Sequence, residues 1–253
     1  MIDTLPVLIG FDAREALAFD VCRHSLLRRS SMPLHVRALR QDGLRHAGLY
    51  RRKAVMRDGQ QVDVIDGRPF STDFSFTRFL VPALCQYEGW ALFVDCDFLF
   101  LADVAELLRC MDDRKAVLVC RQVHDPVEGV KMDGCTQSRY RRKNWSSFML
   151  LNCGHPATKR LTDAAVNERP GSWLHGLEWL RDEEIGDLPH QWNWIAGTTR
   201  GEPKAIHYTT GGPWFPDQAS VAFAREWRDE YAQIRAGARN GATDPLFVSE
   251  QAA

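Results

Sequence analysis

The chain has 253 residues and a formal net charge of −1, and 45% of its residues are hydrophobic and 26% charged. These fractions are those of an ordinary globular protein, and the near-zero net charge gives no general attraction to nucleic acid. The seven cysteines are odd in number and include no Cys-x-x-Cys pair, which argues against a disulfide framework and a zinc ribbon. No segment resembles a secretory signal or a membrane span. We therefore expect a cytoplasmic protein without a transmembrane segment, for which a peripheral membrane association stays open.

The first part of the chain alternates between segments typical of strands and of helices. Residues 5–11 form a short apolar run that ends at Asp12, which predicts the first strand of a sheet covered on both faces. Apolar residues recur at helical spacing over 16–27, and 33–39 returns to a strand pattern. The polar, glycine-containing stretch 42–68 has little periodicity and is predicted to be a loop. This opening is a β-α-β unit.

The remaining segments continue the alternation. Residues 71–87 begin with capping residues and carry apolar side chains on one helical face, which predicts a helix with a kink at Pro82. Strands are expected in the apolar run over 90–102 that carries Asp95, and at 116–120, 147–152 and 204–208. A mobile loop is expected at 122–144, and helices at 157–166, 173–181 and 219–234. We expect one α/β domain over residues 1–253, with a central, mostly parallel mixed sheet flanked by helices.

The most informative motif is Asp95-Cys96-Asp97, which interrupts an apolar run over residues 90–102. Buried carboxylates must be paired, hydrogen-bonded or bound to a metal, and ligands of open α/β sheets collect beyond the carboxyl ends of the strands. Oxygen ligands suit Mg²⁺ or Mn²⁺, whose remaining positions are filled by water and substrate phosphates. The alternative is a strand that ends in a turn, where Asp is common. The apolar residues on both sides favour a metal site for a phosphorylated substrate.

Several motifs together resemble a known family of enzymes. They are the strand end at Phe11-Asp12, the segment Phe76-Thr77-Arg78, the Asp95-Cys96-Asp97 motif followed by Asp103, Asn152-Cys153-Gly154, and His-Tyr-Thr-Thr-Gly-Gly-Pro-Trp from His207 to Trp214. In these motifs the chain resembles glycosyltransferases of the GT-A fold. The likeness is greatest to the retaining family 8 group, which includes glycogenin and bacterial lipopolysaccharide galactosyl- and glucosyltransferases. It extends over most of the chain.

The resemblance implies a role for each matched residue. Asp95, Asp97 and His207 would bind Mn²⁺ or Mg²⁺, and the cation would bridge both phosphates of a nucleotide-sugar donor, usually a uridine one. A divalent cation stabilises the negative charge that develops on the diphosphate as the glycosidic bond breaks. Outside such a motif, a histidine in a strand is more often a hydrogen-bonded core residue. The residues implied to contact the nucleotide-sugar are Phe11, Asp12, Arg14, Arg78, Asp95, Cys96, Asn152, Gly154, Gly211, Gly212 and Trp214.

Within that set, Phe11 would stack on the base and Asp12 would make polar contacts. Arg78 would face the nucleotide or the sugar, unless it is a surface arginine of its helix. At the anomeric carbon a retaining transfer needs a group that steadies an oxocarbenium-like state. Asp182 and Glu183 occupy the place where many family members have Asp-Gln, and Gln191 is their rival for this catalytic role.

One position departs from the family. Family members usually have a phosphate-binding lysine before Pro-Trp, whereas this chain has Gly212. The missing cation could come from the basic run Arg139, Arg141, Arg142 and Lys143, whose alternative role is that of a solvated loop. The two glycines permit close approach to phosphates, while Pro213 and Trp214 would anchor the segment by ring packing. We therefore expect residues 207–214 to close over the donor.

The sequence predicts a metal-dependent glycosyltransferase that transfers a hexose, with retention, to a saccharide, lipid-linked or protein acceptor. A haloacid-dehalogenase-type phosphatase also has Asp-x-Asp after an apolar strand, but at its first strand and with Thr or Val next, where this chain has Phe98. A catalytically inactive nucleotide-sugar-binding protein is the other alternative, which only turnover separates from an enzyme. The sequence specifies neither the acceptor nor the sugar, because variable loops build the acceptor side.

Overall fold

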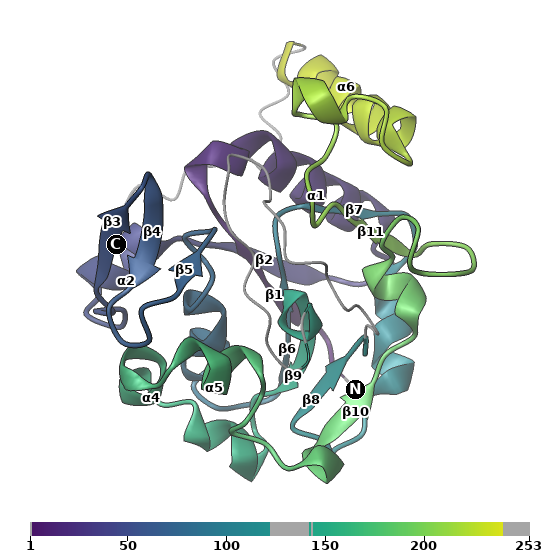
Figure 1. Ribbon diagram of the computed structural model, residues 1–253. Coiled ribbons are helices and arrows are strands. Elements are labelled where there is room, and N and C mark those ends of the chain that lie inside the picture. The colour runs from purple at the N-terminus through teal and green to yellow at the C-terminus, as the bar shows by residue number, and fades with distance from the viewer. Residues whose placement is uncertain (1, 122–141, 143, 240–253) are drawn as a thin grey trace.

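The structure is a computed structural model that describes residues 2–121, 142 and 144–239 (Figure 1). A six-stranded mixed sheet, in the order β10-β8-β9-β6-β1-β2, forms its centre. The strands are β1 (Leu5–Gly10), β2 (Leu34–Leu39), β6 (Trp90–Val94), β8 (Val117–Val119), β9 (Phe148–Asn152) and β10 (Ile185–Asp187). Helices flank the sheet, so the predicted α/β class is confirmed.

Strand direction decides which residues can meet beyond this sheet. β1 is parallel to β2 and to β6. β9 is antiparallel to both β6 and β8, and β10 is parallel to β8. The strands β1, β2, β6, β8 and β10 therefore all end at one edge, which we call the carboxyl edge, and β9 ends at the opposite edge. A ligand site is expected at the carboxyl edge.

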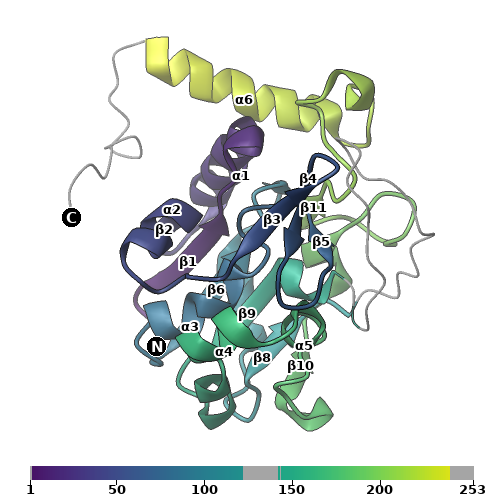
Figure 2. The same cartoon turned by 60° about the vertical axis from the view of Figure 1, so that its left-hand side comes forward.

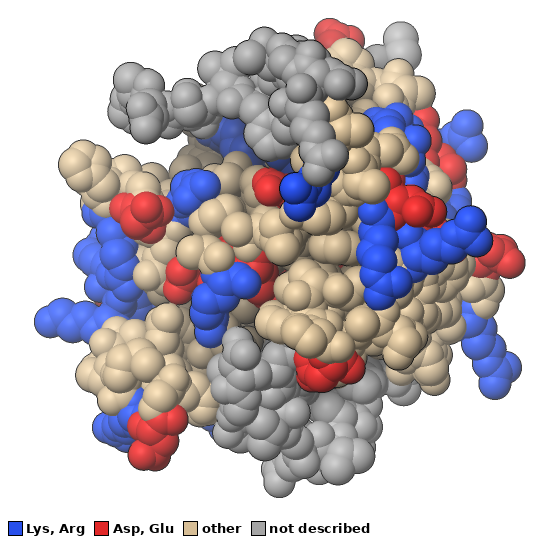
Figure 3. Space-filling view, turned by 90° about the horizontal axis from the view of Figure 1, so that it is seen from above, with Lys and Arg blue, Asp and Glu red and all other residues tan. Residues whose placement is uncertain are grey.

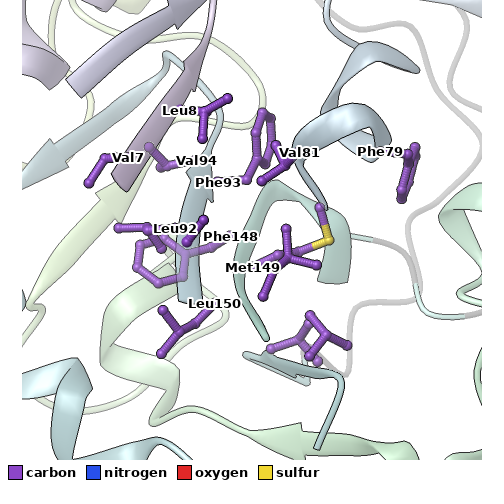
Figure 4. Close-up of a cluster of buried hydrophobic side chains, with 14 of the residues drawn as sticks. Val7, Leu8, Phe79, Val81, Leu92, Phe93, Val94, Phe148, Met149 and Leu150 are labelled. Carbon is purple, nitrogen blue, oxygen red and sulfur yellow. The ribbon is translucent and has the colours of Figure 1, made fainter. Parts of the chain in front are cut away.

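The core is built from the central strands. Every residue of β6 and β9 is buried, which explains why both are continuous apolar runs in the sequence. Figure 4 shows Leu92 and Phe93 of β6 packed among side chains of β1 and β9. Each such side chain contributes about 1.5–3 kcal/mol on burial. This packing gives the carboxyl edge a rigid support.

Two smaller sheets flank the central one. β7 (Phe98–Phe100) pairs antiparallel with β11 (Ala205–His207). The second is an antiparallel sheet of β3 (Ala54–Arg57), β4 (Gln60–Asp63) and β5 (Pro69–Phe70). This sheet, with α2 (Gln41–His46) before it, shows that the predicted loop over 42–68 is wrong. The sequence signal for the β3–β4 hairpin was the dipeptide Asp58-Gly59. Both residues have positive φ, 49° and 76°, as the two-residue turn of a tight hairpin requires.

Several predicted helices are shorter than expected. The helices are α1 (Ala16–Arg29), α3 (Val81–Leu84), α4 (Asp163–Glu168), α5 (Gly171–His175) and α6 (Ala224–Arg239), with 3₁₀ turns η2 (Thr77–Leu80) and η6 (Pro156–Arg160). The helix predicted over 71–87 is thus mainly η2 and α3. Pro82 lies in the first turn of α3, where its missing N–H costs nothing, so the predicted kink is a helix start.

The last helix lies against the first. Figure 2 shows α6 above α1, and the carboxylate of Glu230 binds His24, Arg28 and Arg29 of α1 at 2.6–3.0 Å. None of the described helices combines the length and apolar composition that a bilayer span requires. The loop predicted over 122–144 lies outside the described residues, apart from Arg142 and Asn144.

Candidate metal centre

Three predicted ligands meet at the carboxyl edge. Asp95 directly follows β6, and its backbone N–H donates to the carbonyl of Ser147 at 3.0 Å. Asp97 directly precedes β7, and His207 is the last residue of β11, opposite Phe98. One donor atom from each of Asp95, Asp97 and His207 lies within 4.8 Å of the others. The pairing of β7 with β11 therefore brings distant parts of the chain together as a candidate cation site.

The ring of His207 is held in one orientation. It stacks on Phe98 with 4.4 Å between ring centres, and its Nδ1 lies 2.9 Å from the amide oxygen of Asn193. The amide nitrogen of Asn193 donates to Asn144 and Ser147, so its oxygen faces the histidine and Nδ1 carries the proton. The lone pair of Nε2 then points toward Asp97, at 3.4 Å from its Oδ2. Metal-binding histidines are commonly held in this way.

This donor set fits a divalent cation. Two carboxylates and an imidazole suit Mn²⁺ and also accept other divalent ions, and the side chains of Asp95 and Asp97 are 14% and 13% exposed. They are close enough to bind one ion together and open enough to leave positions for water or phosphate oxygens.

Arg78 is a buried neighbour of the cluster and pairs with Asp95. Its guanidinium is buried, lies 2.9 Å from Asp95 Oδ1, and donates to the carbonyls of Ser146 and Phe74 at 2.9 and 3.3 Å. The surface-helix interpretation of Arg78 is therefore wrong. His175 lies next to this group, with Nδ1 3.0 Å from Ser146 Oγ. Burial, with the charges of Arg78 and Arg52, lowers the pKa of His175 well below its usual value, so this ring is neutral at pH 7.

The first strand delivers Phe11, Asp12 and Arg14 to the same edge. Asp12 is buried and accepts hydrogen bonds from the backbone and side chain of Arg14 and from the backbone of Asp73. Burial opposes its ionisation, but these hydrogen bonds outweigh it and lower the pKa of Asp12. The guanidinium of Arg40 lies 3.7 Å from the ring centre of Phe11 and covers one face. A base could therefore stack on Phe11 only from its other face.

The prediction for Asn152 and Gly154 is wrong. They follow β9, which is antiparallel to β6, so they lie at the edge opposite Asp95. There Gly154 donates to the carbonyl of Gly89 at 3.3 Å. The residue that precedes β9 at the carboxyl edge is Asn144, which the sequence reasoning missed. Asn144 is buried, its carbonyl accepts from Asn193, and its amide nitrogen has no hydrogen-bond partner among the described residues.

Cys96 contributes no side chain to the site. Its thiol is fully buried and lies 3.6 Å from a carboxylate oxygen of Glu15, on the side facing the core. Burial, with the negative charge of Glu15, raises the pKa of Cys96 well above its usual value. Cys96 lies in the turn between β6 and β7, where its side chain is buried while Asp95 and Asp97 each place a carboxylate oxygen in the cluster with His207. Contact of the Cys96 side chain with a donor is excluded in this arrangement.

The two acids predicted at the anomeric carbon are not brought to the cluster. Asp182 and Glu183 precede β10, which runs in the same direction as β6, so they enter the sheet from the edge opposite Asp95. Both side chains are exposed, and they pair with Arg142 and Arg181. Gln191 follows β10 at the carboxyl edge, two residues before Asn193, and stays the candidate.

The glycine segment after His207 packs on itself. Gly211 has a φ of 117°, which favours glycine, and its N–H donates to the carbonyl of Tyr208 at 2.8 Å. Trp214 contacts Tyr208 and Trp227 of α6, with 5.8 and 5.6 Å between ring centres, so the predicted anchoring by ring packing is confirmed for Trp214. A Cβ on Gly212 would lie 2.0 Å from the Trp214 ring. A lysine at position 212 is therefore incompatible with this packing.

Of the four basic residues that could replace the missing lysine, the structure describes only Arg142. The side chain of Arg142 is 7% exposed and donates to the carbonyls of Gly176 and Leu177 at 2.8 and 3.1 Å, so its guanidinium is already engaged. Arg139, Arg141 and Lys143 lie outside the described residues.

Solved structures share this fold. No protein-family model matches the sequence. The bifunctional glycosyltransferase WbbM has a TM-score of 0.55 at 14% identity, over 92% of this chain and 50% of its own. The apo form of the glycosyltransferase GlyE of Streptococcus pneumoniae TIGR4 has a TM-score of 0.56 at 17% identity, over 94% of this chain and 64% of its own. This chain thus spans only half of WbbM and about two thirds of GlyE.

A third structure matches over nearly its whole length. The galactosyltransferase LgtC, solved in complex with donor and acceptor sugar analogs, has a TM-score of 0.55 at 13% identity, over 90% of this chain and 96% of its own. The protein therefore has the GT-A fold of glycosyltransferases, and the family 8 resemblance agrees with LgtC. By sequence, the chain belongs to the same family as Protein CDI of Arabidopsis thaliana, with 46% identity over 231 residues, 88% of this chain and 85% of that protein.

Proposed function

We propose that the protein is a metal-dependent glycosyltransferase that transfers a hexose from a nucleotide-diphosphate sugar. The observation that carries this proposal is the cluster of Asp95, Asp97 and His207 at the carboxyl edge of a GT-A fold. Its support is that WbbM and GlyE are named glycosyltransferases, and that LgtC is a galactosyltransferase crystallised with donor and acceptor sugar analogs.

In the proposed reaction, some residues of this chain would bind the cation and others would orient its ligands. Asp95, Asp97 and His207 would hold Mn²⁺ or Mg²⁺, which when bound neutralises charge on a diphosphate leaving group. Arg78 fixes Asp95, and Asn193 fixes the tautomer of His207. Preorganised groups of this kind lower the barrier because they need not reorient during the reaction.

The finer assignments follow the family resemblance. We propose a uridine nucleotide as the donor and retention of configuration at the transferred sugar. Gln191 is the candidate for assisting at the anomeric carbon, since it follows β10 at the carboxyl edge. The acceptor would be a saccharide, a lipid-linked sugar or a protein.

The alternatives have less support. A haloacid-dehalogenase-type phosphatase places its motif at the first strand, whereas Asp95 follows β6 of a GT-A fold. An inactive nucleotide-sugar-binding protein would use the same cluster without turnover.

The binding half of the proposal is tested by thermal unfolding. Uridine diphosphate with Mn²⁺, at about 100 times its dissociation constant, should stabilise the folded protein by about 2.7 kcal/mol, and about 5–10 °C in Tm. Chelation of Mn²⁺ should remove the shift, because the diphosphate and the carboxylates repel each other. Asp97→Asn should lose the shift, while Asp229→Asn, at an exposed position on α6, should keep it. Equal shifts with and without chelator would refute the metal-bridged site.

The catalytic half is tested by turnover. Parent protein, Asp97→Asn and Gln191→Ala are incubated with Mn²⁺ and a panel of uridine diphosphate sugars, and release of uridine diphosphate is measured. The proposal expects release by the parent, none by Asp97→Asn, and a loss by Gln191→Ala that is larger in kcat than in donor affinity. If the parent binds uridine diphosphate in a metal-dependent way but releases none from the sugar donors, the protein is an inactive nucleotide-sugar-binding protein. The anomeric proton couplings of the product report retention.

A further inference from the structure

Exposed apolar side chains are concentrated on the β3–β4 hairpin. Five large hydrophobic residues in the described part of the chain are exposed, and four of them lie here: Val55 (41%), Met56 (65%), Val64 (54%) and Ile65 (39%). Val55 and Met56 belong to β3, and Val64 and Ile65 follow β4. The fifth, Leu17 (43%), is on α1. We call residues 53–68 the hairpin wing.

Strand β3 of the hairpin wing is exposed on both of its faces, whereas Val62 and Asp63 of β4 are buried. β3 is an outer strand of the three-stranded sheet, and all four of its residues are exposed. Successive side chains of a strand point to opposite faces, so Val55 and Met56 project in opposite directions. β3 and β4 lie at the margin of the molecule in Figure 1. Val55 and Met56 therefore present apolar surface in two directions, and a partner lying on one face of the strand would cover only one of them.

Basic side chains flank the apolar ones. Lys53 is exposed immediately before β3, Arg57 is exposed as the last residue of β3, and Arg68 is exposed just before β5, with Asp58 as the exposed acid of the turn. In contrast, Arg52 is buried in an ion pair with Asp63. The chain as a whole carries a net charge of −1, and Figure 3 shows basic and acidic side chains interspersed on one face. The acids of the hairpin wing are Asp58, Asp63 and Asp66, and Asp63 is the one paired with Arg52. Outside that ion pair, three basic residues face two acids, which leaves the wing a local excess of one positive charge.

We propose that the hairpin wing inserts into the interface of a lipid bilayer that contains anionic lipids. A fluid interface can surround an apolar projection on both faces, which a second copy paired along β3 would not do. The basic residues beside the apolar ones match anionic headgroups. Bilayer binding of this kind combines burial of apolar side chains with short-range electrostatic attraction.

The hairpin wing is connected to the carboxyl edge of the central sheet. β5 leads into Ser71, whose carbonyl accepts from Arg14, and into Asp73, whose N–H donates to Asp12 at the carboxyl edge. A membrane-bound wing would hold this edge near the lipid surface. In this respect the inference rests on the proposed function, because it would favour a lipid-linked acceptor.

Flotation with vesicles tests the insertion without any donor or turnover. Parent protein should float with vesicles of phosphatidylcholine and phosphatidylglycerol, and much less with phosphatidylcholine alone. Lys53→Glu with Arg57→Glu should weaken partitioning by about fivefold or more for each basic residue, and added salt should weaken the parent in the same direction. Met56→Asp with Val64→Asp should abolish flotation. Leu17→Asp, an equally polar change at an exposed leucine outside the wing, should float like the parent.

Three results would overturn the proposal. One is a parent protein that stays unbound with both vesicle types, and another is unchanged flotation of the hairpin variants. The third is a parent that dimerises without binding vesicles and loses dimerisation in the hairpin variants, since that would assign the surface to a second copy. Thermal unfolding of every variant confirms that it is folded. Metal-dependent binding of uridine diphosphate, measured on the same proteins, reports separately on the proposed function.

Discussion

Asn193 and His207 share a buried hydrogen bond of 2.9 Å, which determines the ring nitrogen that faces Asp97. Asn193 is fully buried, and its amide is fixed in turn by Asn144 and Ser147. The orientation of the candidate metal ligand is therefore set by a residue that lies behind it.

Replacing this support should weaken the cation site. Asn193→Leu removes the acceptor for Nδ1–H, and we expect about a 10–100-fold loss of Mn²⁺ affinity because the imidazole is no longer held in its binding tautomer. Titration of free Mn²⁺ by electron paramagnetic resonance measures this without donor or turnover. His207→Ala gives the reference for complete loss of the ligand. An Asn193→Leu protein that binds Mn²⁺ like the parent would show that the bond only supports packing.

Removal of Arg78 should destabilise the protein less when Mn²⁺ is present. Arg78→Met leaves the carboxylate of Asp95 without its buried counter-charge, which typically costs about 3–5 kcal/mol. A bound cation would compensate part of that charge, so the loss in urea unfolding should be smaller with Mn²⁺. Arg114→Met removes an arginine that is 86% exposed in its pair with Asp112, and should have little effect on unfolding in either condition because solvent screens the pair. An identical loss for Arg78→Met with and without Mn²⁺ contradicts the site.

Any side chain at position 212 should disturb the Trp214 packing. Gly212→Ala places a Cβ about where the Trp214 ring now lies, and we expect a loss of about 1–3 kcal/mol in unfolding free energy. Gly212→Lys should be destabilised similarly, so restoring the family lysine will not simply tighten diphosphate binding. Gly43→Ala is the matched control, because nothing lies within 4 Å of its Cβ and α2 should gain about 0.5–1 kcal/mol. Gly212→Ala with parental stability would mean that Trp214 moves at little cost.

The contact between α1 and α6 should weaken in acid. Burial opposes the ionisation of Glu230, but hydrogen bonds from Arg28, Arg29 and His24 outweigh it and lower its pKa to about 2. A carboxyl whose pKa is lower in the folded state stabilises the fold above its unfolded pKa, near 4.3. We expect Glu230→Gln to cost roughly 2 kcal/mol at pH 7, allowing for screening of the half-exposed Arg28. The difference from the parent should shrink as pH falls from about 4.3 toward 2, measured by thermal unfolding; a constant difference contradicts it.

The sequence contained enough information for the central strands and the three candidate ligands. Asp95 and Asp97 adjoin apolar runs, which is a local pattern independent of pairing, whereas His207 was predicted from the family resemblance of residues 207–214. Asn152 and Gly154 were misplaced because a strand buried on both faces has the same composition in either direction, and the sequence does not show that β9 is antiparallel. Direction is a property of the assembled sheet.

Other differences have separate physical causes. The β3–β4 hairpin is short, exposed and polar at its ends, so hydrophobic periodicity did not reveal it, although Asp58-Gly59 is a known turn signal. Asn193 and Asn144 carry no motif, since their roles come from hydrogen bonds between distant segments. Asp182 and Glu183 were chosen by alignment to a family pattern. Spacing along the sequence does not determine at which edge of the sheet these two residues lie.

The pairing of β7 with β11 also constrains how the protein is made. A ribosome synthesises the chain from its N-terminus at about 5–20 residues per second, so Asp95 and Asp97 leave the tunnel several seconds before His207. Until Ala205–His207 has emerged, β7 has no strand to pair with and the histidine ligand is missing. A nascent chain stalled before β11 therefore has the two carboxylates without the third ligand. Binding of a cation by all three candidate ligands would therefore require that the last third of the chain has folded back on the middle.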